Sequence, residues 1–325
     1  MSHLLVVLEH DRGQWAEAND EALTAARRLS TDMGADLHGA LVGDGGADLV
    51  QNAAAGGCAV VHVVSHDLLN DFGPEANGES LTQLISQSQP EAVVAVGTSR
   101  GNEVMAHIAA RLDVPFVANC QQIEPTDDIW SATRVQWGGS LLEDAELEAP
   151  IKLASYAHHA VAAQPADEPG TGTVLEFTPD LDPSLARTIV RDRDVQTAGV
   201  TLSTAQVVVS GGRGVGSEEG FGALEELAAE LGGKVGCSRA VTNLGWRNHT
   251  DQVGQTGTRI APEIYIATGI SGAIQHWVGA MASKRILAIN TDPEANMVVK
   301  ADYAVIADLH EVVPAITEEI RRRKA

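Results

Sequence analysis

The sequence predicts an α/β protein of two domains, each with a mainly parallel sheet flanked by helices. Three observations support this prediction. Short apolar runs alternate with segments of helical periodicity, a stretch rich in proline, glycine and acids interrupts the alternation, and 325 residues suffice for two domains of ordinary size. We therefore expect a first domain at 1–162, a linker region with one short strand at 163–199, and a second domain at 200–325.

The first domain is expected to begin with a strand and to continue in β-α order. Apolar runs of the kind buried on both faces of a parallel sheet occur at 4–8, 37–42, 59–64 and 92–96. Helices are predicted at 15–29, 48–55, 81–87 and 102–112. Beyond Pro115 the segments 130–136, 138–142 and 151–154 are predicted to be strands without helices between them. This pattern indicates a small antiparallel addition to the parallel core.

The second domain repeats the β-α order after the strand expected at 174–177. Further strands are predicted at 205–209, 264–267, 285–289 and 303–306. A helix at 218–231 ends at Gly232-Gly233, where a left-handed cap is expected. The helix at 272–282 has Ser271 as its candidate N-cap. The C-terminal helix ends in four basic residues, which suit the negative end of its dipole.

The charge of the chain excludes some classes of partner. The chain has 44 acidic and 22 basic residues, a formal net charge of -22, which argues against nucleic-acid and anionic membrane-surface partners. Residues 1–199 contain 30 acids and 10 bases, whereas 200–325 contain 14 and 12. Only five of the bases are lysine, and this composition resembles that of proteins from halophilic organisms. We interpret most of the charge as solvated surface.

The sequence contains no recognisable membrane span or secretory signal, and its cysteines are not arranged in pairs. No stretch approaches the ~18 uninterrupted apolar residues of a membrane span, and the N-terminal residues show no secretory signal. We therefore expect no direct membrane insertion and a cytoplasmic location. Cys58, Cys120 and Cys237 lie far apart, which predicts buried thiols rather than disulfides or a metal or redox pair.

A glycine-rich loop at 210–217, which includes Arg213, joins a predicted strand to a predicted helix. Glycines at such a place let backbone N–H groups approach a phosphate. The loop lacks the spacing of the GxGxxG fingerprint and the Lys-Ser/Thr of a P-loop. Taken alone, it is about as consistent with a plain tight turn as with a phosphate site.

Further polar elements follow strands of the same predicted sheet. Ser238 and Arg239 end one strand, although pairing with a nearby carboxylate is the simpler explanation for Arg239 alone. The loop at 252–257 and the helix entry at 269–276 offer uncharged donors, and Asn290 precedes another loop. Because ligands of open parallel sheets bind at the carboxyl ends of strands, these groups together predict a cradle for a large, flat, phosphate-bearing cofactor. They contain no nucleophile-base pair.

These segments resemble the FAD-binding domain of the alpha subunit of electron transfer flavoprotein in both order and spacing. The resemblance covers about 205–315 and rests on 207–214, 236–240, 252–257 with 261–263, 269–276 and 301–309. It is weaker over 1–160, where 96–99 and 109–112 are similar to the family's N-terminal domain. It implies a Rossmann-like second domain with FAD as cofactor and no metal.

The resemblance implies a set of contact residues. Arg239 would lie against the isoalloxazine ring, Thr256 would hydrogen-bond near its N5, and His276 would lie near O2 and N1. A guanidinium and a donor at these places would stabilise the anionic reduced flavin. Contacts to FAD are implied for Arg213, Ser238, Arg239, Val253, Gly254, Gln255, Thr256, Ser271, Gly272, Ala273, Ile274, Gln275, His276, Asn290, Asp308 and Leu309.

The implied function is that of an electron carrier rather than a substrate-converting enzyme. With a beta subunit, the chain would take electrons from dehydrogenases such as acyl-CoA dehydrogenases of fatty acid β-oxidation and deliver them to a membrane quinone oxidoreductase. Two alternatives remain open. One is an electron-bifurcating complex that uses NADH, and the other is a stand-alone regulatory protein that binds an adenine nucleotide in the same cradle.

Overall fold

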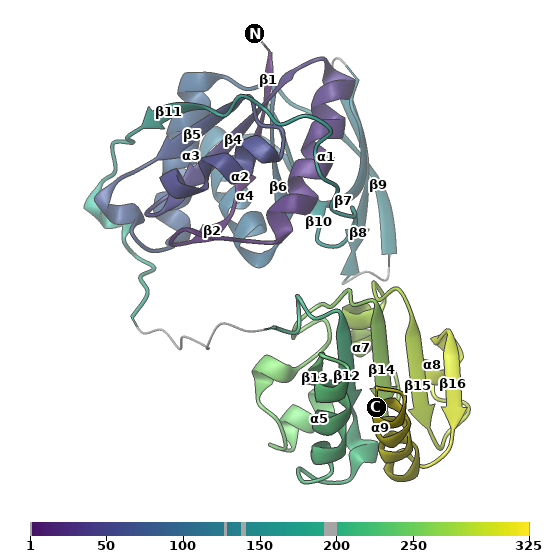
Figure 1. The fold of residues 1–325 in the computed structure, drawn as a ribbon. Helices are drawn as coiled ribbons and strands as arrows, with labels where there is room; N and C mark the ends of the chain where they lie inside the picture. Colours follow the sequence, from purple (N-terminus) through teal and green to yellow (C-terminus); the bar gives the residue numbers. More distant parts are fainter. Residues whose placement is uncertain (1, 127–128, 138–140, 192–199, 325) are drawn as a thin grey trace. The chain divides into compact units, whose positions relative to one another are not determined.

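The computed structural model describes residues 2–126, 129–137, 141–191 and 200–324, which divide into two units near residue 195. The first unit contains a sheet whose described strands run in the order β11-β5-β4-β1-β6-β10-β7-β8-β9 (Figure 1). Their bounds are β1 His3–Leu8, β4 Asp36–Val42, β5 Val60–Val64, β6 Ala92–Gly97, β7 Phe116–Glu124, β8 Ile129–Gln136, β9 Leu141–Glu148, β10 Lys152–Ala157 and β11 Thr173–Phe177. A short hairpin pairs β2 (His10–Asp11) with β3 (Gln14–Trp15).

Helices cover both faces of this sheet. The first face is covered by α1 (Ala18–Met33) and α2 (Val50–Ala55), which share a core cluster with one side of β1. The second face is covered by α3 (Pro74–Ser88) and α4 (Ser99–Leu112), which share a core cluster with the other side of β1. Strand β1 is buried along its whole length, as its unbroken apolar sequence predicts for a central parallel strand. The α/β prediction for this half of the chain is confirmed.

The antiparallel addition differs from the expectation in one respect. Strands β7, β8 and β9 form antiparallel pairs, as the pattern beyond Pro115 indicated, although residues 138–140 lie outside the described part of the chain. The prediction was wrong for 151–154, because β10 inserts between β6 and β7 and runs parallel to both. Leu153 and Ala154 are almost completely buried there, so this strand belongs to the parallel core.

Part of the segment expected to be a linker at 163–199 belongs to the first unit, and it contains the short strand that the sequence predicted. Strand β11 pairs in parallel with β5 at one edge of the first sheet. Before it, the N–H of Gly170 donates to the carbonyl of Ala54 at 2.8 Å, and the N–H of Thr173 donates to that of Ala59 at 2.9 Å. Through these backbone hydrogen bonds residues 170–177 belong to the first unit. Residues 192–199 lie outside the described part of the chain.

The second unit has a fully parallel sheet in the order β13-β12-β14-β15-β16. The strands are β12 Val207–Gly211, β13 Lys234–Cys237, β14 Ile264–Thr268, β15 Ile286–Asn290 and β16 Tyr303–Ile306. The helices are α5 Phe221–Glu230, α6 Arg239–Asn243, α7 Ile274–Ala280, α8 Asn296–Lys300 and α9 Leu309–Lys324. In chain order the strands are arranged 2-1-3-4-5, a doubly wound topology whose ligands bind where the order reverses, between β12 and β14.

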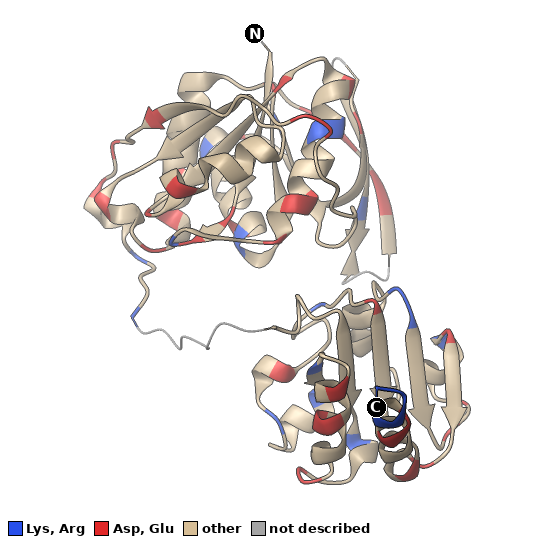
Figure 2. Cartoon of the chain, viewed as in Figure 1, with Lys and Arg blue, Asp and Glu red and all other residues tan. Residues whose placement is uncertain are grey.

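Two helices cover each face of this sheet. Helices α5 and α9 pack on one face, and α7 and α8 on the other. The predicted cap at the end of α5 is confirmed, because Gly232 adopts a φ of 64°, and the basic residues at 321–324 form the last turn of α9, blue in Figure 2. The prediction of Ser271 as N-cap was wrong. Helix α7 begins at Ile274, and Ala273 takes the N-cap position without a side-chain hydrogen bond.

Candidate functional site

A cavity of about 620 Å³ opens at the carboxyl ends of β12, β13, β14 and β15. This is the point at which the strand order reverses. Its lining comes from the loops that follow these strands and from the starts of α6 and α7. The lining residues are Gly212, Arg213, Gly214, Ser238, Arg239, Ala240, Asn243, Gly269, Ile270, Ser271, Gly272, Ala273, Gln275, His276, Asn290, Asp292 and Ala295.

Glycines allow the loops of this cavity to pack backbone against backbone. A Cβ at Gly212 would lie 2.1 Å from the carbonyl oxygen of Gly269, and a Cβ at Gly214 would lie 2.7 Å from the Cα of Gly269. Gly272 has a φ of 77°, and a Cβ there would lie 2.3 Å from the backbone nitrogen of Met297. The glycines of these loops are therefore required by the close approach of three backbone segments. A phosphate contact by the glycine-rich loop stays a prediction.

His276 is the buried polar group of the cavity. It is 6% exposed, and its Nε2 shares a hydrogen bond of 2.7 Å with the hydroxyl of Tyr265 on β14. Its Nδ1 is buried and makes no well-aligned hydrogen bond among the described residues, although the backbone of Val253 lies near enough to the ring to raise its pKa slightly against the effect of burial. Burial lowers the pKa of His276 from 6.5 to about 4, so the imidazole is neutral at pH 7. A buried ring nitrogen without a well-aligned hydrogen bond indicates that a further polar group is expected at this site.

The positive charge of the cavity comes from two exposed arginines. Arg213 follows β12 and Arg239 begins α6, directly after β13. No described carboxylate lies within ion-pair distance of Arg239, so the simpler explanation of a salt bridge is not supported. Asp292 also lines the cavity and brings one negative charge. A guanidinium without a partner in an open cavity is suited to an anionic ligand.

The loop at 253–256 supports the cavity rather than lining it. The N–H of Val253 donates to the carbonyl of Cys237 at 2.9 Å, and the N–H of Gln255 donates to that of Gln275 at 2.7 Å. The Oγ1 of Thr256 accepts from the Nε2 of Gln252 at 3.0 Å. The loop therefore braces the first turn of α7, which carries His276.

The remaining expected contacts differ in their positions. Ile274 is exposed at the start of α7 outside the cavity lining. Asp308 accepts from the N–H of His310 at 2.9 Å and so orders the start of α9, while Leu309 is buried behind Gly269. Asn290 does line the cavity, and its Nδ2 donates to the carbonyl of Ile270 at 3.1 Å, which joins two of the loops.

Five lining residues with side chains are absent from the expected contacts, namely Ala240, Asn243, Ile270, Asp292 and Ala295. A signal existed for two of them. Asn243 lies four residues after Arg239 and hence on the same face of α6. Asp292 follows the end of β15 by two residues, where the rule of ligands at strand ends applies. Within the described residues no helix is long and apolar enough to cross a bilayer.

The fold and the cavity are those of a two-domain α/β protein whose second domain binds a nucleotide cofactor at its switch point. Residues 201–281 match a family model described as the electron transfer flavoprotein FAD-binding domain, and residues 4–182 match the electron transfer flavoprotein domain. The chain belongs to the electron transfer flavoprotein family, among the relatives of its alpha subunit. The family prediction and FAD as its cofactor are thereby confirmed.

Several relatives match over the full chain. The electron transfer flavoprotein subunit alpha of Thermoanaerobacterium thermosaccharolyticum is 33% identical over 98% of both chains. That of Bacillus subtilis is 34% identical over 99% of this chain and 98% of its own. Protein FixB of Bradyrhizobium diazoefficiens is 33% identical over 99% of this chain and 89% of its own.

Proposed function

We propose that this chain is the FAD-carrying subunit of a cytoplasmic heterodimer with an electron transfer flavoprotein beta subunit. In this proposal it takes electrons from flavin dehydrogenases such as acyl-CoA dehydrogenases and passes them to a membrane quinone oxidoreductase. The observation that supports this proposal is the set of chemical groups that line the cavity. Its described lining offers two guanidinium groups, one carboxylate at Asp292 and neutral donors, and no nucleophile-base pair. Such a lining suits a cofactor that carries electrons and not a substrate that must be activated.

The cavity residues fit FAD in size and chemistry. A volume of about 620 Å³ lies within the range of cofactor pockets. The close approach of Gly212 to Gly269 keeps side chains away from the loops beside which a pyrophosphate would lie. The buried Nδ1 of His276 makes no well-aligned hydrogen bond among the described residues and would find a partner in a carbonyl oxygen of the flavin.

Each group of residues has a separate proposed role. Bound FAD supplies the capacity to accept and release electrons. Arg239 stabilises negative charge on the cofactor by its fixed positive charge, and His276 donates as a neutral imidazole that Tyr265 orients. The loop at 253–256 holds α7 in place through the backbone hydrogen bond between Gln255 and Gln275, and the contact of Thr256 with the cofactor rests on the resemblance alone. The proposed contacts are those implied by the resemblance, with Asn243 and Asp292 added from the cavity lining.

Reduction of the bound flavin by defined donors tests the proposal. The chain is produced with and without its candidate beta subunit, FAD per chain is counted, and absorbance of the oxidised flavin is followed after addition of an acyl-CoA with its dehydrogenase, or of NADH. We expect one FAD per chain in this subunit and bleaching by the acyl-CoA system. Bleaching by NADH alone would favour the bifurcating alternative. A chain that retains no FAD but binds an adenine nucleotide would overturn the proposal.

A further inference from the structure

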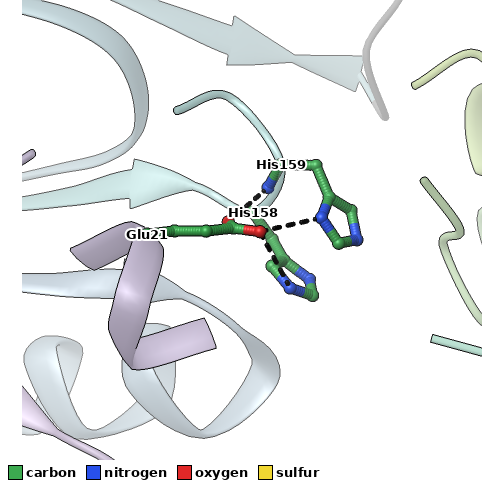
Figure 3. A group of neighbouring side chains, drawn as sticks. All are labelled: Glu21, His158 and His159. Atoms are coloured by element: carbon green, nitrogen blue, oxygen red, sulfur yellow. Dashed lines mark hydrogen bonds and ion pairs between the residues drawn. The ribbon is translucent and has the colours of Figure 1, made fainter. Parts of the chain in front are cut away.

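A polar cluster of Glu21, His158 and His159 lies in the first unit, and none of its members lines the cofactor cavity (Figure 3). Glu21 is in the first turn of α1, and the two histidines directly follow β10. Because β10 is a parallel strand, the cluster lies at the carboxyl edge of the first sheet. That edge is where open α/β sheets place their ligands.

The distances within the cluster suit one small ion. The Nδ1 of His159 lies 3.0 Å from the Oε1 of Glu21, and the Nε2 of His158 lies 4.0 Å from the same oxygen. One ligand atom from each residue lies within 4.8 Å of the other two. With metal-ligand bonds of about 2.0–2.1 Å, the ligand atoms of a tetrahedral ion are about 3.3 Å apart. Small side-chain rotations would therefore bring the three atoms around one ion.

The carboxylate is already oriented for this purpose. The backbone N–H of His159 donates to the Oε2 of Glu21 at 2.8 Å, which fixes the plane of the carboxyl group. His159 adopts a φ of 65°, a left-handed conformation rare for a residue other than glycine, and this turn brings both its N–H and its ring to Glu21. Burial alone would raise the pKa of Glu21, but the hydrogen bonds from His159 lower it below the usual value and keep the group ionised.

The cluster leaves one polar atom unsatisfied. The Nε2 of His159 is buried without a hydrogen-bond partner among the described residues. It is not the ring nitrogen that meets Glu21, which is Nδ1, so it would point away from an ion held by the three ligand atoms and would remain free to bind an outer partner, as the second nitrogen of metal-bound histidines usually does. The rings of His158 and His159 are stacked with centroids 3.7 Å apart, and Figure 3 shows one nitrogen of each ring facing the carboxylate of Glu21.

We propose that Glu21, His158 and His159 bind one divalent transition-metal ion, with Zn²⁺ as the first candidate. Two imidazoles and one carboxylate are ligands typical of zinc and its neighbours, whereas Mg²⁺ and Ca²⁺ prefer oxygen ligands alone. The three side chains are 13–24% exposed, so a fourth position is open to water. The 30 acids and 10 bases of residues 1–199 favour the accumulation of cations near this unit.

The test measures Zn²⁺ binding to the full FAD-containing chain by isothermal titration, with Co²⁺ absorption to report the coordination geometry. We expect one Zn²⁺ per chain and a tetrahedral Co²⁺ spectrum. Glu21→Gln and His158→Ala should each weaken binding by at least about 10- to 100-fold, because the loss of even an outer-shell partner of a metal site costs that much. Glu21→Gln keeps the shape of the side chain, so it remains informative if a histidine variant folds poorly, which circular dichroism would reveal.

Two matched controls separate this site from other histidines. His310→Ala removes an exposed histidine of α9 in the second unit. His38→Gln removes the centre of another histidine group, in which the Nδ1 of His38 lies 3.3 Å from the Nε2 of His62. Both variants should bind Zn²⁺ as the parent chain does. No binding by the parent chain, unchanged affinity in Glu21→Gln, or loss of binding in His38→Gln alone would each overturn the proposal.

Discussion

Lowering the pH from 7.5 to 5.0 should destabilise the second unit through one buried side chain, His276. Its pKa is about 4 in the folded chain because burial disfavours the charged imidazole, whereas an unfolded histidine titrates near 6.5. As the pH falls, the unfolded state therefore binds the proton first. The stabilisation is complete above about pH 6.5, declines below it, and is lost entirely by about pH 4. At pH 5.0 the calculated loss is about 2 kcal/mol.

Hydrogen exchange in the flavin-free chain measures this loss locally. The free energy of opening is taken from amides of β14, which carries Tyr265 beside His276, at both pH values. His276→Gln serves as the control because a glutamine stays neutral throughout. The parent chain should lose about 2 kcal/mol more than this variant between pH 7.5 and 5.0. Equal losses in the two proteins would refute the reasoning that burial holds His276 neutral.

Three further outcomes follow from the cavity. Arg239→Ala should lower the potential of the first one-electron step of the bound flavin by about 40 mV, the equivalent of about 1 kcal/mol for an exposed charge. A spectroelectrochemical titration showing no shift would place the guanidinium away from the flavin. Gly272→Ala should lower the free energy of unfolding of the second unit in urea by about 1–3 kcal/mol and weaken FAD binding, because its Cβ would meet the backbone of α8. Gly216→Ala is the control, since Gly216 also has a positive φ but no atom within 4 Å of its Cβ position, and this variant should leave FAD binding unchanged. Tyr265→Phe removes the hydrogen-bond partner of the Nε2 of His276, so the free energy of unfolding measured in denaturant should fall by about 1–3 kcal/mol. An unchanged free energy of unfolding would mean that water replaces the hydroxyl.

The cavity could be predicted in large part because strand ends can be read from local sequence. Ser238 and Arg239 follow a short apolar run, and in a parallel sheet all such ends meet at one edge. The 253–256 loop could not be placed in the same way. Its contact with α7 depends on Gly254 approaching Gly279 so closely that a Cβ on the latter would lie 2.4 Å away, a long-range fit that no local pattern expresses.

Topology in the first unit shows the same limit. The apolar run at 151–154 predicted a strand correctly, but its insertion between β6 and β7 depends on pairing partners about 60 and 37 residues away. The histidine cluster is a similar case. His158-His159 is visible in the sequence as a pair, whereas Glu21 lies 138 residues from His159. Only folding of α1 against the end of β10 brings the third potential ligand into place.

The electrostatics of the cavity follow from the difference between its histidine and its arginines. His276 is withdrawn from titration near neutral pH by burial, so it contributes a hydrogen bond and no charge. Arg213 and Arg239 are exposed and bring positive charge to the cavity, while Asp292 offsets part of it. The field on the cofactor is thus set by fixed charges. We infer that the arginines, and not His276, supply the positive charge that an anionic cofactor would meet in this cavity.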